Sequence, residues 1–185
     1  MSPRARIKRT PGYIRPMKRR SLHVSAIGDY GIETVELPNG RVVDLAVLRH
    51  PGASAVVPLH DDGTVTLLRQ HRHAAGGTIW EIPAGKLDPG EGPEVCAARE
   101  LAEEAGLAGT LTHLTTIHTT PAFTDEVIHL YVATGLRSVP AHLDDDEVLD
   151  PVRLPLADAL ALIRRGELTD AKSIVALLLV EQRRA

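Results

Sequence analysis

The sequence is poor in cysteine, in aromatic residues and in long apolar runs. Of its 185 residues one is a cysteine, Cys96, and 3% are aromatic. A single cysteine excludes a disulfide scaffold and any zinc module with several cysteine ligands, and it fits a reducing compartment. The longest apolar run, residues 174–180, is too short to cross a bilayer, and no stretch near the start resembles a secretory signal. We therefore expect a cytoplasmic protein with no membrane partner.

Positive charge is concentrated at the beginning of the chain. Residues 1–20 carry eight lysines and arginines and no acid, whereas the rest of the chain has 13 basic and 24 acidic residues. A basic arm can bind nucleic acid, but only Tyr13 could stack on a base, and the acidic remainder is a poor match for such a partner. We interpret residues 1–20 as a flexible arm, 21–50 as an N-terminal β-segment and 51–185 as the main domain, and we expect no nucleic-acid partner.

The order of turn residues and β-branched runs predicts a mixed α/β fold. Pro38-Asn39-Gly40 is typical of a hairpin turn, because Asn-Gly accepts positive φ angles. Pro93 can occupy the first position of a helix that Gly106 ends. The strands lack the regular alternation with helices of a doubly wound fold, which favours a mixed sheet flanked by helices. Strands are predicted over 32–37, 41–48, 53–59, 64–69, 78–82, 111–117 and 126–133, and two further helices over 156–165 and 170–182.

Three glutamates of the predicted helix share one face. Glu100, Glu103 and Glu104 are three and four residues apart, so their carboxylates repel one another, and near the C-terminus they oppose the helix dipole. A divalent cation would relieve this repulsion, and oxygen ligands without a nearby cysteine or histidine favour Mg²⁺ or Mn²⁺. By spacing alone, a solvated acidic face explains them equally well. The opposite, apolar face is predicted to comprise Val95, Ala98, Ala102 and Ala105.

The segment around this helix resembles the Nudix hydrolase signature at every specified position. It reads G-x5-E-x7-R-E-L-x-E-E-x-G-L over residues 85–107. The resemblance implies a Nudix fold, with a mixed sheet between helices, that hydrolyses a nucleoside diphosphate linked to another group and uses two or more divalent ions. It implies that Glu100 and Glu104 are the main metal ligands, that Glu103 adjoins them as a ligand or catalytic group, and that Ala84 adds its carbonyl oxygen. We call residues 85–107 the Nudix box; its structural residues are then Gly85, Glu91, Arg99 and Gly106.

A second motif is similar to one found in ADP-ribose pyrophosphatases. Residues 120–126, T-P-A-F-T-D-E, follow that subfamily's S-P-G-x-[ST]-[DE]-E pattern, with Ala122 where glycine is usual, and Pro121 lies 15 residues after Gly106. The resemblance implies hydrolysis of ADP-ribose to AMP and ribose 5-phosphate, and a homodimer formed by exchange of the N-terminal β-segment. Hydrolysis of another nucleoside diphosphate sugar, of oxidised nucleotides or of dinucleotides stays open, as does a non-catalytic nucleotide-sensing module.

The catalytic base and the substrate contacts are less sharply indicated. The subfamily places a glutamate on a loop after the box, which points to Glu147, with Asp145 as the alternative. Arg69 and Arg72 are candidate phosphate clamps, since guanidinium pairs with phosphate oxygens in a bidentate manner. Further candidates for substrate contacts are Glu81, for a ribose hydroxyl, and Tyr30, Pro121 and Phe123, with Tyr30 the best candidate for stacking on the base. We expect Trp80 and Cys96 to be packing residues, and His71 and His73 to be surface histidines rather than zinc ligands.

Overall fold

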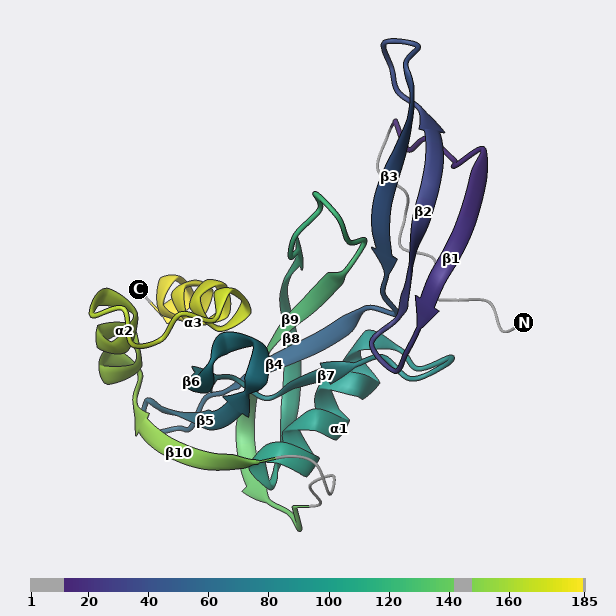
Figure 1. The fold of residues 1–185 in the computed structure, drawn as a ribbon. Coiled ribbons are helices and arrows are strands. Elements are labelled where there is room, and N and C mark those ends of the chain that lie inside the picture. Colours follow the sequence, from purple (N-terminus) through teal and green to yellow (C-terminus); the bar gives the residue numbers. More distant parts are fainter. Residues whose placement is uncertain (1–11, 142–147, 185) are drawn as a thin grey trace.

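The first three strands of the computed structural model, which describes residues 12–141 and 148–184, form a sheet of their own. This sheet contains β1 (Lys18–Val24), β2 (Asp29–Glu36) and β3 (Val42–Arg49), all antiparallel, and it projects away from the rest of the molecule (Figure 1). The turn between β2 and β3 contains Gly40 with φ 79°, whereas Asn39 does not have the positive φ angle that we expected of the Asn-Gly pair. Because β1 begins at Lys18, three residues that we assigned to the arm are part of a strand.

The remaining strands form two sheets. The larger has the order β7-β4-β9-β8, in which β4 and β9 run parallel and the other pairs antiparallel, so the expected mixed sheet is present. The smaller has the order β10-β5-β6, and a 3₁₀ turn, His73–Ala75, joins β5 to β6. The strand bounds are β4 Ala53–Pro58, β5 Thr64–Arg72, β6 Gly77–Glu81, β7 Ala84–Lys86, β8 Leu107–His118, β9 Val127–Ser138 and β10 Leu149–Pro155.

Helices cover both faces of the larger sheet, because neighbouring side chains of β4 pack against different helices. All six residues of β4 are buried. Ala55 and Val57 belong to a core cluster with α2 (Leu156–Arg164) and α3 (Ala171–Arg184), whereas Val56 packs with Ala97 and Leu101 of α1 (Pro93–Ala105). Successive side chains of a strand point to opposite faces, so the sheet lies between α1 on one side and α2 and α3 on the other (Figure 1).

The bounds of α1 are those predicted, but its buried face is not. Pro93 begins the helix, and Gly106 ends it with φ 62° and its N–H bonded to the Ala102 carbonyl. The expected apolar face is wrong, because Val95 is 63% exposed. The buried side chains are instead Cys96, Ala97, Glu100, Leu101 and Glu104. Two of the glutamates therefore face inward beside the core.

Strand β10 was not predicted, because its sequence contains two prolines. Pro151 and Pro155 cannot donate to a strand partner. Since β10 pairs with β5 alone, it is an edge strand, where proline is tolerated. Within the described ranges, no helix has the length and apolar character needed to cross a membrane.

Candidate functional site

A cleft of about 910 Å³ brings residues of the two predicted motifs together. The box contributes Gly85 and Glu104 to its lining, Ala84 directly precedes the box, and Glu126 comes from the second motif. Other lining residues include His50, His71, Arg72, Glu81, Thr119 and Lys172. The cleft therefore combines carboxylates and cationic side chains from β4 to α3.

Gly85 allows strand β7 to lie directly against helix α1. A Cβ atom at this position would be 1.7 Å from Oε1 of Glu100, a distance at which the two atoms cannot coexist. One residue earlier, the N–H of Ala84 donates to Oε2 of Glu104 at 2.8 Å. Glu100 is 6% exposed and Glu104 is 2% exposed. The glycine and the adjacent amide thus hold β7 beside two buried carboxylates.

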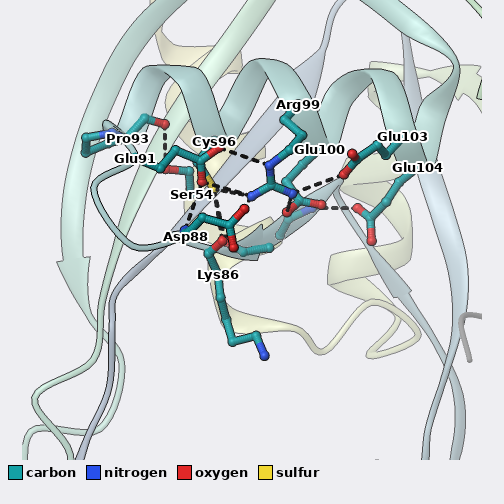
Figure 2. A network of polar contacts seen from close by, with 12 residues as sticks. Ser54, Lys86, Asp88, Glu91, Pro93, Cys96, Arg99, Glu100, Glu103 and Glu104 are labelled. Carbon is teal, nitrogen blue, oxygen red and sulfur yellow. Dashed lines mark hydrogen bonds and ion pairs between the residues drawn. The ribbon is translucent and has the colours of Figure 1, made fainter. Parts of the chain in front are cut away.

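Arg99 lies at the centre of a polar network between α1 and the loop before it (Figure 2). Its Nε and Nη2 donate to the two oxygens of Glu91, each at 3.0 Å. Its Nη1 donates to Glu100 at 2.6 Å and to Glu103 at 3.0 Å. The hydrogen bonds from Arg99 lower the pKa of Glu91, and the bonds to Glu91 raise the pKa of Arg99. Arg99 and Glu91 therefore brace the loop against the helix.

The oxygen donors of the box suit a hard divalent cation. Three carboxylates and the Ala84 carbonyl are the ligand types that Mg²⁺ and Mn²⁺ prefer. Across the described residues, no group of three acidic, histidine or cysteine side chains is already gathered in metal-binding geometry. Glu100 and Glu103 are instead bonded to Arg99, so binding an ion would require these carboxylates to turn from the guanidinium toward the cleft.

On another wall of the cleft, a buried carboxylate holds two cations. Glu81 is 2% exposed, and Nε and Nη2 of Arg72 donate to its two oxygens, each at 2.9 Å. Lys172 of α3 donates to Oε2 of Glu81 at 2.8 Å and lies 3.0 Å from Asp170. Burial favours the neutral acid, but the bonds from Arg72 and the charge of Lys172 outweigh it and lower the pKa of Glu81. Lys172 was missed because nothing in its spacing marks it.

Arg69 does not converge with Arg72. Both residues lie in β5, and side chains three residues apart on a strand point to opposite faces, so the two guanidinium groups do not meet as we predicted. The Arg69 guanidinium lies over the ring of Trp80, 4.7 Å from its centre. Trp80 itself packs against the core, and Cys96 is fully buried, as expected of packing residues.

Pro121 and Phe123 line a second, smaller cavity of about 310 Å³. It lies where the loop after β8 runs along the end of β3, with the Leu48 N–H bonded to the Phe123 carbonyl at 2.8 Å. Tyr30 is 41% exposed on β2. The expected base-binding residues are therefore on or beside the N-terminal sheet, apart from the main cleft.

The two candidate bases, Glu147 and Asp145, lie outside the described residues. Val148, which follows them, lines the cleft. Two further cleft residues, Glu126 and His50, were not singled out from the sequence. Glu126 is the last position of the second motif, to which no role was assigned, and a lone histidine such as His50 carries no spacing signal.

Comparison with known proteins identifies the family. The NUDIX domain family matches residues 48–177. An ADP-ribose pyrophosphatase of Bacillus subtilis is 42% identical over 152 residues, 80% of this chain and 82% of that protein. A methanol dehydrogenase activator of Bacillus methanolicus is 42% identical over 149 residues, 79% of this chain and 80% of that protein. A solved structure described as an ADP compounds hydrolase has a TM-score of 0.78 at 24% identity, covering 94% of this chain and 95% of that one. The family match, the 42% identity to these relatives and the shared fold show that the chain belongs to the Nudix family.

Proposed function

We propose that this Nudix protein hydrolyses the diphosphate bond of ADP-ribose to give AMP and ribose 5-phosphate, or that of a related nucleoside diphosphate sugar. The observation that supports this most directly is the cleft, in which box residues Gly85 and Glu104 share one cavity with Arg72. A diphosphate needs both cations and metal ligands close to it, and this cavity supplies both. The B. subtilis relative is named for ADP-ribose, and the structural neighbour for ADP compounds.

Nudix hydrolases generally require divalent metal ions, and we propose Mg²⁺ or Mn²⁺, two or more, for this chain. Glu100, Glu103, Glu104 and the carbonyl oxygen of Ala84 would hold them. Such ions neutralise phosphate charge and make bound water more acidic. The support from the structure is the donor chemistry of these residues and the glycine that gives the loop access to them.

Arg72 is the proposed phosphate-binding residue. Glu81 engages its Nε and Nη2, which leaves the Nη1 edge of the guanidinium for a phosphate oxygen. Because Glu81 is buried and fixed, the guanidinium is oriented before substrate arrives, and such preorganisation reduces the entropy lost on binding. Both oxygens of Glu81 are engaged by Arg72 and Lys172, so the structure supports a role in orienting cations more than the ribose contact that we expected.

The remaining roles complete the proposal. Glu147 is the proposed base, with Asp145 as the alternative, and the place of Val148 in the cleft lining supports a base from this segment. Tyr30, Pro121 and Phe123 are proposed to contact the base of the nucleotide in a homodimer built through the segment 21–50. The residues before β1, which begins at Lys18, remain a proposed arm. A cytoplasmic location also remains part of the proposal, and the free Cys96 is consistent with it.

The proposal is tested by hydrolysis of ADP-ribose in ¹⁸O-labelled water with defined Mg²⁺. The position of the label identifies the phosphorus that is attacked. Glu104→Gln should reduce turnover at least about 100-fold because it removes a charged ligand while keeping the shape of the side chain. Glu94→Gln, at the exposed start of α1, is the matched control and should retain wild-type rates. Wild-type turnover by Glu104→Gln would contradict the ligand assignment.

The name of the B. methanolicus relative leaves a second candidate, a protein that acts on another protein or binds a nucleotide without turnover. The complete set of Glu100, Glu103 and Glu104 favours catalysis, because a binding module has no need of these carboxylates. A panel of ADP-ribose, other nucleoside diphosphate sugars, oxidised nucleotides and dinucleotides separates the possibilities. Tight nucleotide binding without any phosphate product over hours would favour the binding module.

A further inference from the structure

His50 lies in the wall of the cleft, with its ring oriented by a glycine turn. Its side chain is 6% exposed, and Nδ1 accepts a hydrogen bond from the Gly52 N–H at 3.1 Å. Gly52 has φ 96°, and a Cβ atom there would lie 2.8 Å from a methyl group of Leu87, so this turn depends on glycine. Since Nδ1 is an acceptor, the neutral ring carries its proton on Nε2.

The opposite side of the His50 ring faces Glu126. Nε2 lies 3.4 Å from Oε1 of Glu126. The charged groups around the ring are Glu126, Asp125 and Lys86. Burial lowers the pKa of His50, and this effect exceeds the opposing influence of the two acids. At neutral pH the ring is therefore uncharged, and its Nε2 lies beside a carboxylate without a hydrogen bond to it in this structure.

Glu126 is also held from its other side. Its Oε2 accepts a hydrogen bond from the Thr119 hydroxyl at 2.7 Å, and its N–H donates to the Thr124 hydroxyl at 3.1 Å. The main chain of His50 is attached to the same loop, since its N–H donates to Asp125 at 2.8 Å. An ionised carboxylate accepts hydrogen bonds only, so the lone pairs of Glu126 that face the cleft suit the hydroxyl groups of a ligand.

We propose that His50 is a positioning residue that orients Glu126 to accept hydrogen bonds from the sugar hydroxyls of the substrate. This inference rests on the proposed function, because it assigns the sugar of a nucleoside diphosphate sugar to the cleft. The distance of 3.4 Å is longer than a hydrogen bond, and we expect it to shorten when substrate binds, as such contacts in free enzymes often do. No proton is transferred in this role.

Substitution of His50 by glutamine or by asparagine distinguishes the roles of its two ring nitrogens. Glutamine can place its amide N–H near the position of Nε2, whereas asparagine can replace only Nδ1. His50→Asn should therefore raise KM for ADP-ribose about tenfold with kcat nearly unchanged, while His50→Gln should stay within about twofold of wild type. In a Glu126→Gln background, His50→Asn should have no further effect. His113→Asn, at an exposed position of β8, is the control.

Equal KM values for His50→Asn and His50→Gln would overturn the proposal, as would a fall in kcat alone. Circular dichroism and thermal unfolding establish that each variant is folded. If the wild type hydrolyses no nucleoside diphosphate sugar, the proposed function fails, but the geometry is still decided by ¹⁵N NMR of the histidine rings. We expect the Nε2–H tautomer of His50 at pH 7 and a shifted Nε2 resonance in Glu126→Gln. An Nδ1–H tautomer, or an unchanged Nε2 resonance, would overturn the positioning of Glu126.

Discussion

Gly85 and Glu100 show how a missing side chain shapes the candidate metal site. The Glu100 carboxylate occupies the space where any other residue at position 85 would place its Cβ atom. The atoms that a Cβ would meet are the far end of a flexible side chain and not backbone. Substitution therefore displaces the carboxylate while the backbone can stay in place.

Gly85→Ala should accordingly affect activity more than stability. We expect a loss of about 1–2 kcal/mol in the free energy of unfolding, typical of one extra methyl group in a packed site, and a fall in turnover of at least about 100-fold because Glu100 leaves its position. Urea denaturation and an ADP-ribose assay measure the two effects. Gly77→Ala is the control, since a Cβ there meets nothing within 4 Å. If Gly85→Ala has the same free energy of unfolding and the same turnover as the wild type, Glu100 has no role at this position.

At the scale of secondary-structure elements, Glu81 and Lys172 join α3 to β6 inside the cleft wall. The Lys172 side chain is 12% exposed, and Asp170, which also contacts it, accepts a hydrogen bond from the Ser173 N–H in the first turn of α3. The hydroxyl of Ser173 in turn accepts a hydrogen bond from the Ile82 N–H at 2.9 Å. The start of the helix is thus fixed to the strand by connected polar contacts.

This ion pair should make stability depend on pH in a defined direction. The pKa of Glu81 is lowered in the folded state, so its contribution is complete above its ordinary value near 4.5 and is lost as the pH falls through the lower, folded value. Lys172→Met should lower the free energy of unfolding by about 1–3 kcal/mol at pH 7. The loss should be no larger because Arg72 still pairs with Glu81. The difference in the free energy of unfolding between Lys172→Met and the wild type should become smaller below about pH 4.5.

Urea denaturation at several pH values measures this dependence. Arg41→Met, which removes a positive charge near the exposed turn after β2, is the matched control and should show no such narrowing. A difference between Lys172→Met and wild type that stays constant from pH 7 to pH 3 would mean that the lysine acts through the packing of its stem.

The elements differ in how far the sequence predicts them. The bounds of α1 follow from local chemistry, because Pro93 and Gly106 act at their own positions. Its buried face does not, because alanine has so little apolar surface that tertiary contacts decide which side faces inward. Glu100 and Glu104 are buried against Gly85 and Ala84 of β7, and periodicity carries no information about such partners.

The candidate site was predictable where residues are close in sequence and not where the fold brings them together. The Nudix box lies within one segment, so its carboxylates could be named. Arg72, Glu81 and Lys172 meet across 100 residues of chain, and only the first two were named. Arg69 was paired with Arg72 because both lie near a strand end, although strand geometry separates them.

At the scale of the whole molecule, the N-terminal sheet is held together, and attached to the rest of the chain, by ion pairs. Inside this sheet Glu33 is 3% exposed and forms ion pairs with Arg19 and Arg49. Arg49 also forms an ion pair with Asp125 of the second motif, at 3.0 Å. The hydrogen bonds and charge of Glu33 help to raise the pKa of Arg49. The sheet is therefore internally bonded and attached to the loop beside the cleft, while much of its apolar surface stays outside the core.

That apolar surface supports the proposed homodimer. Val24 is 69% exposed and Val42 is 56% exposed, on a sheet that projects from the body (Figure 1). Val24 pairs with Asp29 at one end of β2 and Val42 pairs with Glu36 at the other end, so the two valines lie on opposite faces of the sheet. Exposed apolar side chains on a projecting element commonly mark an interface, and a stable one buries about 800 Å² on each partner. The protein should sediment as a dimer at micromolar concentration.

Substitution of both valines by lysine should convert the dimer to a monomer. The two positions sample both faces and both ends of the sheet, so an interface formed by either face would bury a charge without a partner. If Tyr30 contacts the base across that interface, the monomer should also have a raised KM for ADP-ribose. Lys18→Met, which removes a charge from the same sheet, is the control and should leave the dimer intact. Analytical ultracentrifugation and steady-state kinetics measure the two effects. A monomeric wild type would refute the dimer, and a dimeric double variant would place the interface elsewhere. A monomeric double variant with unchanged KM would separate assembly from base recognition and leave each cleft complete within a single chain.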